Sequence, residues 1–247
     1  MFQNLFRNIS PVVKNLLILN VLFFVAQFAV PDIMNKLELY PIVSEEFKPW
    51  QLATHFFMHS TQGLMHIFFN MFALVIFGSQ LEQRWGPKRF LIYYLATAIG
   101  AALLHLLVGY LRLKNLESGL SPAELNQILT EGFEYLRNNK NYVDPIMGQL
   151  NLSLFLLYNT PVIGASGAVF GLLAAFGYLF PNTELYLMFI PVPIKAKYFV
   201  IGYAAIELYS GIANNPGDNV AHFAHLGGAL VGIVMVIIWQ RQKNQFY

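Results

Sequence analysis

The segment that decides the fold is Gly164-Ala165-Ser166-Gly167, which opens the apolar run from Ala168 to Phe180. Small residues recur along it near helical spacing, at Gly167, Gly171, Ala174 and Ala175. Such residues let membrane helices approach one another closely. They would also leave the hydroxyl of Ser166 exposed, as a nucleophile requires. The motif by itself therefore fits both helix packing and a catalytic serine, and the rest of the chain has to decide between them.

The composition indicates a polytopic membrane protein. The 247 residues are 56% hydrophobic and 11% charged, and the mean hydropathy is +0.50. A soluble domain is typically about 25% charged. The chain has no cysteine, which excludes a disulfide framework and a cysteine nucleophile. Its formal net charge of +2 is too small to indicate a partner nucleic acid.

Apolar runs long enough to cross a lipid bilayer, or nearly so, occur six times. Crossing takes about 20 residues, with about 17 as a lower limit. The runs are Asn15–Pro31, about Leu64 to just before Glu82, Phe90–Leu111, Ser166–Phe180, Tyr198–Ala213 and Asn219–Gln240. The fourth run is short, and we expect Pro181 to Thr183 to extend it. The sequence therefore predicts an all-α bundle of six transmembrane helices, formed by one domain over residues 1–247.

The basic residues predict the orientation of this bundle. With both termini in the cytoplasm, nine of the 15 basic residues lie on that side, in short segments near span ends: Arg7, Lys14, Arg84, Lys88, Arg89, Lys195, Lys197, Arg241 and Lys243. This distribution is what the positive-inside rule requires. We therefore expect cytoplasmic termini. The compact chain, which carries no targeting extension, favours a bacterial inner (plasma) membrane.

Two longer segments then lie on the outer side. We expect Asp32–Gly63 to lie in the membrane interface. Residues 112–144 are predicted to form an extramembrane helical insertion, because Ser121-Pro122-Ala123-Glu124 has the form of a helix start. Apolar residues on one face predict an amphipathic helix that ends near Asn138. Pro145–Pro161 is interpreted as an interfacial or re-entrant approach to the serine.

Polar residues inside the spans converge at one depth. Such residues are costly in lipid and usually mark function or a specific partner. His66 and Asn70 lie early in the second span, and His225 lies early in the sixth. With the N-terminus inside, the even-numbered spans all run from the outer to the inner side. At 1.5 Å per residue, these three residues and Ser166 fall within roughly 10 Å of depth, which predicts one shared site.

Histidine and serine at this depth suit nucleophilic catalysis. A serine hydroxyl is a weak nucleophile and needs an adjacent base, which His225 supplies near neutral pH. Gly228 and Gly232 on the sixth span would approach Gly167 and Gly171 on the fourth. Close packing of these glycines would bring the imidazole and the hydroxyl within reach of each other.

Donors for a developing oxyanion are also present. His66 and Asn70 are four residues apart and share one helical face. Both side chains can donate hydrogen bonds to an oxyanion, which preorganised donors stabilise. Backbone amides at the start of the helix that begins at Ser166 add further donors and the positive end of the helix dipole.

These residues resemble three signatures of the rhomboid family of intramembrane serine proteases. The matching segments are Gly164-Ala165-Ser166-Gly167, His66-Ile67-Phe68-Phe69-Asn70 and Ala224-His225-Leu226-Gly227-Gly228-Ala229-Leu230-Val231-Gly232, with Leu81-Glu82 and Gly86 as lesser matches. The resemblance covers about Trp50 to Gln240. It implies a six-helix bundle with a serine-histidine dyad in a water-filled cavity that opens to the outside.

The resemblance also implies roles and partners. Ser166 would be the nucleophile and His225 the base, and His66, Asn70 and the Ser166 amide would line the oxyanion hole. Supporting positions would be Gly164, Gly167, Phe170 and Gly228. The implied substrates are transmembrane segments of other proteins, cleaved near their outer ends. No metal or cofactor is implied.

Three positions fall outside the family pattern. Trp50-Gln51 stands where many members carry Trp-Arg, so we expect a contact in that loop to differ. Phe170 stands where some members place a tyrosine against the histidine, and its ring can still stack on the imidazole. Glu207, midway through the fifth span, has no assignment from the family. It is either a protonated carboxyl group that is hydrogen-bonded inside the bundle, or a contact for the substrate.

Three other classes of function compete with a protease. A metal site is suggested by the spacing of His55 with His59 and of His222 with His225, but no His-Glu-x-x-His motif and no carboxylate on the same spans near that depth completes it. A transporter would more often have halves related by a repeat, and none is visible. A non-catalytic relative that binds or escorts membrane clients would be expected to lack the serine or the histidine. The sequence therefore favours the protease, with the client-binding protein as the alternative.

Overall fold

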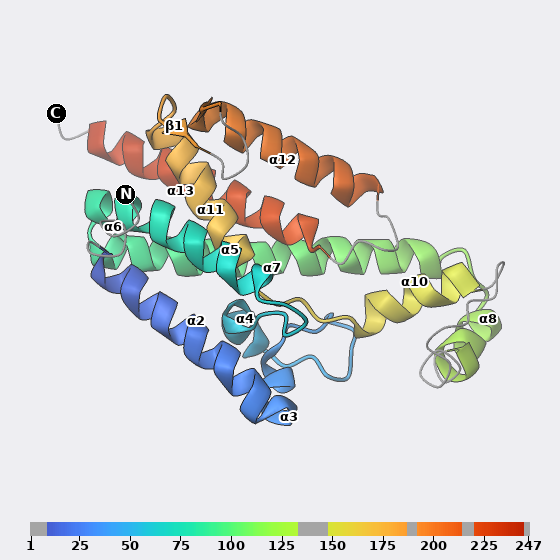
Figure 1. Ribbon diagram of the computed structural model, residues 1–247. Coiled ribbons are helices and arrows are strands. Elements are labelled where there is room, and N and C mark those ends of the chain that lie inside the picture. The colour runs from blue at the N-terminus through green and yellow to red at the C-terminus, as the bar shows by residue number, and fades with distance from the viewer. Residues whose placement is uncertain (1–8, 133–147, 187–191, 214–219, 245–247) are drawn as a thin grey trace.

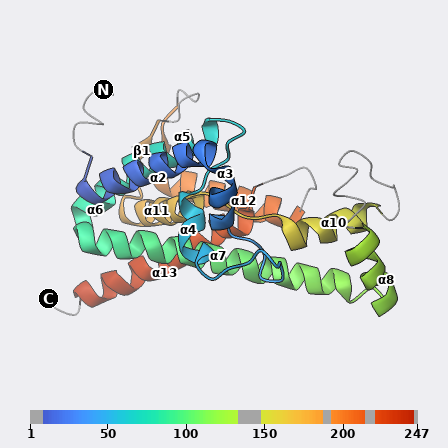
Figure 2. The same cartoon turned by 90° about the horizontal axis from the view of Figure 1, so that it is seen from below.

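The computed structural model describes residues 9–132, 148–186, 192–213 and 220–244. This part of the chain is mostly helical, as the composition predicts, and its long helices lie together in one bundle (Figure 1). Beyond the helices there is one two-stranded antiparallel hairpin, β1 (Glu184–Leu185) with β2 (Ile194–Lys195). A view turned by 90° shows that α7 runs along the whole length of the bundle (Figure 2).

Each of the six predicted spans contains helix. The helices are α2 (Pro11–Ala29), the succession α5 (Met65–Ala73), η3 (Leu74–Gly78) and α6 (Ser79–Trp85), then α7 (Pro87–Glu117), α11 (Ser166–Leu179), α12 (Ala196–Ala213) and α13 (His222–Asn244). Within the described residues, four helices are long and apolar enough to cross a membrane: Pro11–Ala29, Met65–Trp85, Pro87–Glu117 and His222–Gln242. The chain is therefore an integral membrane protein of polytopic type, and six crossings stay a prediction.

The shortest of these helices, α11, lies at the centre of the bundle. It has 14 residues, and every residue from Gly167 to Gly177 is buried. The predicted extension through Pro181 is wrong, because α11 ends at Leu179 and a turn follows in which the Thr183 N–H donates to the Phe180 carbonyl. Proline lacks the N–H that an α-helix requires and ends it here.

Glycines bring α11 and α13 together, as predicted. A Cβ atom on Gly228 would lie 1.8 Å from the carbonyl oxygen of Gly167, which no side chain could tolerate. A Cβ atom on Gly232 would lie 3.0 Å from Cα of Gly171. Only residues without a side chain allow the two backbones to lie this close. The contact fixes the first turns of the two helices beside each other.

The insertion differs from its predicted boundaries. The helix α7 continues past Leu111 to Glu117, and its 31 residues span about 46 Å, which exceeds the hydrocarbon core of about 30 Å. The helices η4 (Ile128–Gly132) and α10 (Gly148–Asn159) pack on this extension through a second core, which is formed by Leu113, Ile128 and Leu154. The helix α8 (Pro122–Gln127) directly precedes η4.

The predicted helix start in the insertion is confirmed, with Ser121 and Glu124 forming a complete capping box. Its predicted end near Asn138 lies outside the described residues. The predicted approach segment is the helix α10, followed by an extended stretch that leads to Ser166. Whether α10 is interfacial or re-entrant stays a prediction.

The segment between α2 and α5 holds the chain in front of Ser166. It contains α3 (Pro31–Met34), η1 (Asn35–Leu37), α4 (Gln51–Thr54) and η2 (His55–Phe57). Leu39 and Val162 exchange two backbone hydrogen bonds of 3.0 and 2.8 Å, and the N–H of Gly164 donates to the carbonyl of His55 at 3.0 Å. These contacts tie the segment between α2 and α5 to the residues that precede the candidate nucleophile.

The side chain of Gln51 connects several backbone groups of this segment by hydrogen bonds. Its side chain is 1% exposed. The amide oxygen accepts from the N–H groups of Tyr40 and Lys48, and the amide nitrogen donates to the carbonyls of Lys36 and Glu46. The position where the family pattern has arginine is thus filled here by a glutamine that makes four hydrogen bonds to its own loop.

The other end of the bundle is closed by a buried carboxylate. Glu82 on α6 accepts a hydrogen bond from the Ser10 hydroxyl and from the N–H groups of Val12 (3.0 Å) and Val13 (2.9 Å) at the start of α2. These N–H groups have no acceptor within their own helix. The start of α2 and the end of α13 lie at this same end (Figure 1), whereas the side of the membrane that it faces stays a prediction.

Candidate active site

Ser166 is presented by a turn that only glycine permits. Gly164 adopts a φ of 115°, which residues with a Cβ atom rarely adopt. A Cβ atom there would also lie 2.9 Å from Cε1 and Nε2 of His66. The turn ends at Ala165, and Ser166 is the first residue of α11. The half-buried serine therefore lies at the start of a helix, and the ring of His66 lies against the turn that precedes it.

Ser166 and His225 are in direct contact. The Nε2 atom of His225 lies 2.8 Å from the Oγ atom of Ser166. His225 is buried in the first turn of α13, and the ring of Phe170 stacks on its imidazole with the centroids 4.2 Å apart and the planes 7° apart. The stacking predicted for Phe170 is present. The contact between the two helices through their glycines thus brings a hydroxyl onto an imidazole nitrogen.

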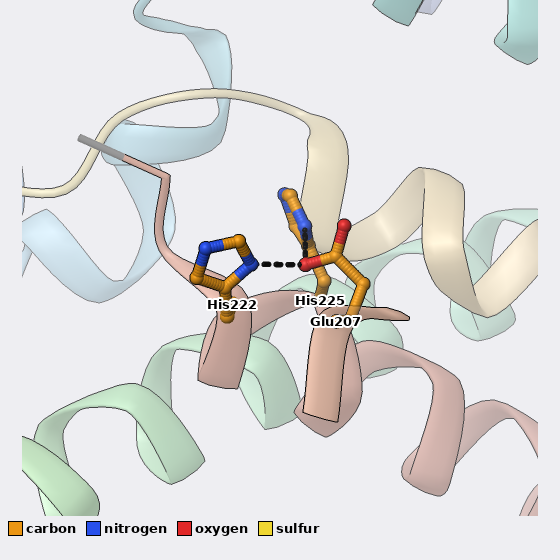
Figure 3. Close-up of side chains that lie close together, drawn as sticks. All are labelled: Glu207, His222 and His225. Carbon is orange, nitrogen blue, oxygen red and sulfur yellow. Dashed lines mark hydrogen bonds and ion pairs between the residues drawn. The ribbon is translucent and has the colours of Figure 1, made fainter. Parts of the chain in front are cut away.

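A third side chain, Glu207 of α12, lies on the far side of the same imidazole (Figure 3). One carboxylate oxygen, Oε2, lies 2.8 Å from Nδ1 of His225 and 2.7 Å from Nδ1 of His222. Glu207 is 4% exposed. Of the two interpretations from the sequence, the structure bears out the hydrogen bonding inside the bundle, with two histidines as the partners. The predicted proton on this carboxyl group stays a prediction.

Glu207, His222 and His225 are also the residues that could hold a metal ion. One ligand atom from each lies within 4.8 Å of the other two. No carboxylate lies on the same span as these histidines near their depth. Glu207 contacts His222 and His225 from the neighbouring helix α12. Hydrogen bonds to Glu207 nevertheless account for the contact of both Nδ1 atoms with this carboxylate, and we assign no metal.

The other histidine pair is engaged with its own backbone. Nδ1 of His55 lies 2.9 Å from the carbonyl of Gln51, and Nδ1 of His59 lies 3.3 Å from that of Phe57. Burial lowers the pKa of each ring to about 4, so both histidines are neutral at pH 7. This pair stabilises the loop above the site.

His66 presents a donor toward the turn before Ser166. Its Nδ1 atom accepts a hydrogen bond of 3.1 Å from the backbone N–H of Ser60. The proton of the neutral ring must then be on Nε2, and this atom lies against Gly164. The first backbone bond within α11 runs from the Val169 N–H to the Ala165 carbonyl, so the amides before it have no acceptor in the helix. The structure thus places the His66 ring against Gly164, and the free amides at the start of α11, and their role as oxyanion donors stays a prediction.

Asn70 is placed differently from its predicted partner. It lies one turn beyond His66, and its amide nitrogen donates to the His66 carbonyl at 2.8 Å. Its amide oxygen is buried and has no hydrogen-bond partner among the described residues. The structure thus brings Ser166 and His225 together, with His66 against the turn before the serine, while the amide of Asn70 bonds to its own helix.

Known proteins resemble this chain over most of its length. A family model described as the rhomboid domain matches residues 46–242. The RHOMBOID-like protein 12, mitochondrial, of Arabidopsis thaliana is 31% identical over 199 residues, which cover 79% of this chain and 47% of that protein. The Rhomboid protein 1, mitochondrial, of Saccharomyces cerevisiae is 26% identical over 225 residues, or 89% and 50%.

A bacterial relative is similar to the same part of the chain. The Rhomboid protease AarA of Providencia stuartii is 24% identical over 202 residues, which cover 77% of this chain and 56% of that protein. The chain spans about half the length of the curated relatives that it matches.

Proposed function

The chain belongs to the rhomboid family, and from this premise we propose that it is an intramembrane serine endopeptidase, which cleaves transmembrane segments of client proteins near their outer membrane face by a Ser-His dyad. The observation that carries the proposal is the 2.8 Å contact between Ser166 Oγ and His225 Nε2. The alternative, a non-catalytic relative that binds or escorts clients, does not require this contact.

The proposed reaction begins with attack by Ser166 on a client carbonyl carbon. As the C–O bond forms, the hydroxyl proton passes to Nε2 of His225. The tetrahedral intermediate then collapses, the C–N bond breaks, and His225 gives the proton to the leaving amine. Water attacks the resulting ester with His225 again as the base, and Ser166 regains its proton when the carboxyl product leaves.

The intermediate carries a negative oxygen that needs donors. Nε2–H of His66 and the amide of Ser166 are the groups best suited to supply them, because both lie beside the turn before the nucleophile. Asn70 is the third proposed donor, with an amide group that would turn from the His66 carbonyl toward the oxyanion. Donors that are already in place cost no reorganisation during the reaction.

A client helix must partly unwind before it reacts. The carbonyl of a helical peptide bond is hydrogen-bonded and shielded by side chains. Clients with Gly or Pro near their outer end should therefore be cleaved faster, because these residues weaken a helix by about 1 to 3 kcal/mol each.

The test of this proposal is cleavage by the purified protein in liposomes. One client segment carries Gly-Pro near its outer end, and a matched segment carries Leu-Leu there. We expect cleavage of the first at least 10-fold faster, and none by the Ser166→Ala protein. Equal cleavage of both segments would contradict the unwinding step. A folded wild-type protein that bound both and cleaved neither would support the client-binding alternative.

We also propose that all six helices cross the membrane in one domain, with cytoplasmic termini. Helix α11 is enclosed by its neighbours, so its short length is compatible with a crossing. Because the chain has no cysteine, Glu45→Cys and Gln242→Cys can each be labelled with an impermeant maleimide in intact cells. Labelling of Gln242→Cys alone would contradict the proposed orientation.

The membrane that holds the protein is a separate matter. The sequence favoured a bacterial inner membrane, whereas two of the three relatives described above carry mitochondrial names. These relatives weaken that prediction. The apolar helices support the coarser statement that the protein is integral to a membrane.

A further inference from the structure

We infer that Glu207 is a positioning residue, whose carboxylate holds His225 in the tautomer and orientation that the reaction needs, so that the dyad works as a Ser-His-Glu relay. This inference rests on the proposed function. The contacts form one line from α11 through α13 to α12. Ser166 Oγ lies 2.8 Å from Nε2 of His225, and Nδ1 of the same ring lies 2.8 Å from Oε2 of Glu207.

The chemistry of the two ring nitrogens gives Glu207 its role. A neutral imidazole carries one N–H, and an ionised carboxylate can only accept a hydrogen bond. The Glu207 contact therefore places the proton on Nδ1, and it leaves the lone pair of Nε2 directed at the Ser166 hydroxyl. When Nε2 takes the serine proton, the carboxylate stabilises the imidazolium and itself stays unprotonated.

Two contacts together hold the imidazole in place. The stacked ring of Phe170, 4.2 Å away, fixes the plane of the imidazole. Stacking alone leaves the ring free to turn within that plane, and the bond to Glu207 removes this freedom. The phenylalanine has no hydroxyl, so the polar contact to the ring comes from α12.

A purely structural role explains a glutamate at position 207 less well than the positioning role does. A carboxylate inside a membrane span is costly, and a neutral glutamine could join α12 to α13 with less cost. A buried carboxylate gives the largest electrostatic stabilisation to a group that becomes positively charged during the reaction, because charge interactions are stronger in a low-dielectric interior. An apolar cleft of about 430 Å³ lies between α12, α11 and α13, and Glu207 makes its polar contacts with α13 outside the residues that line this cleft.

His222 supplies the matched control. It contacts the same oxygen as His225, at 2.7 Å, but we assign it no step of the reaction. In His222→Gln, the glutamine amide can still donate to Glu207, and the contact with His225 is untouched. This variant therefore changes the junction between α12 and α13 without changing the relay.

The experiment compares Glu207→Gln, Glu207→Asp and His222→Gln with wild type and Ser166→Ala, in the full chain, by client cleavage and thermal unfolding. We expect Glu207→Gln to lower kcat by at least 10-fold, and at most by the roughly 10⁴-fold that loss of a triad carboxylate costs. KM should change by less than about 3-fold, since a positioning residue acts after binding. Glu207→Asp should restore part of kcat, and His222→Gln should stay within about 3-fold of wild type.

Three results would overturn the inference. The first is a wild-type kcat in folded Glu207→Gln. The second is an equal loss in His222→Gln, which would assign Glu207 to the junction between helices. The third is wild-type activity that is lost with a chelator and restored by Zn²⁺, which would assign the carboxylate to a metal. A wild-type protein that cleaves nothing would instead overturn the proposed function itself.

A second measurement needs no variant at position 207, should Glu207→Gln fail to fold. The ring nitrogens of His225 can be observed by NMR in wild-type protein labelled with ¹⁵N-histidine, and assigned with His225→Ala. We expect the tautomer with the proton on Nδ1. A proton on Nε2 in the neutral ring would contradict the relay.

Discussion

Two buried glutamates, at opposite ends of the bundle, use their charge in different ways. Glu82 is 2% exposed and Glu207 is 4% exposed. The partners of Glu82 are a hydroxyl and two backbone N–H groups, none of which changes its charge near pH 7. The partners of Glu207 are two imidazoles, one of which contacts Ser166. The partner of a buried carboxylate, more than its burial, separates a structural role from a chemical one.

The same contrast holds for the two helix starts. The first turn of α2 is filled by the Glu82 carboxylate, which satisfies the free N–H groups and the positive end of the helix dipole. The first turn of α11 begins at the candidate nucleophile, and its free N–H groups face the place where an oxyanion would develop. One end of the bundle therefore has a side-chain carboxyl group at its helix start, and at the other end we propose that a transient oxyanion takes this place.

The largest effects in this comparison are expected on the helix start at Ser166. His66→Ala should lower kcat by about 10² to 10³, as loss of one oxyanion donor typically does. Asn70→Ala should have the smaller effect, because the Asn70 amide donates to its own helix in the structure. Both rates are measured on the same client segment. Complete loss of activity in both variants, with loss of folding, would indicate a structural role instead.

Glu82→Gln tests the hydrogen bonds that the buried Glu82 side chain accepts at the start of α2. A glutamine offers one neutral acceptor where the carboxylate accepts three hydrogen bonds, so the protein should lose about 1 to 3 kcal/mol of stability. Its kcat per folded molecule should stay within about 3-fold of wild type. Thermal unfolding and client cleavage on one preparation measure both quantities. An activity loss as large as that of Glu207→Gln would remove the distinction between the two glutamates.

The smallest expected effect is acid lability of the loop above the site. The pKa of His55 and of His59 is lowered to about 4 by burial, from 6.5 in the unfolded chain. Because these pKa values are lowered, the unfolded state binds more protons than the folded state. The contribution of the two histidines to the free energy of unfolding is therefore fully present above pH 6.5 and is lost as the pH falls toward 4. Between pH 7 and pH 5.5, each histidine should lower the free energy of unfolding by about 1 kcal/mol.

The control for this pH effect is His59→Gln, which removes one of the two titrating rings. The midpoint of thermal unfolding should fall less between pH 7 and pH 5.5 in this variant than in wild type. An equal fall in both proteins would show that groups other than these histidines govern the acid lability.

Much of the bundle could be predicted from the sequence, because apolar length and glycine spacing act locally. The six helical segments follow from local apolar length. The contact of Gly228 with Gly167 was predicted from glycine spacing on two spans, and the stacking of Phe170 from the resemblance to the family. Boundaries were less predictable. Helix α7 extends to Glu117, where η4 and α10 pack on it, and contacts between distant segments leave no local signal.

The partner of Glu207 was missed for a different reason. The predicted site includes residues of the even-numbered spans alone, and Glu207 belongs to the fifth. Glu207 lies six residues before the predicted end of the fifth span at Ala213, and His225 lies six residues after the predicted start of the sixth at Asn219. The same arithmetic would have put both at one depth. His222 lies three residues before His225 and so on the same helical face, which was a second available signal.

The hydrogen bonds of Gln51 could not have been predicted from residue spacing. Its four hydrogen bonds go to backbone groups that the loop brings together only when it is folded. Sequence indicated only that the contact of this loop would differ from the family pattern. The physical content of that difference is a neutral amide that both donates and accepts, where a guanidinium could only donate.

The most direct test of the central claim is the reaction of Ser166 with a fluorophosphonate probe, which labels activated serines. The detergent-solubilised wild-type protein is compared with Ser166→Ala and His225→Ala, with folding checked by thermal unfolding. The account predicts that wild type is labelled, that Ser166→Ala is not, and that His225→Ala is labelled far more slowly. Absence of labelling in a folded wild-type protein that cleaves no client would contradict the account and support a role in client binding.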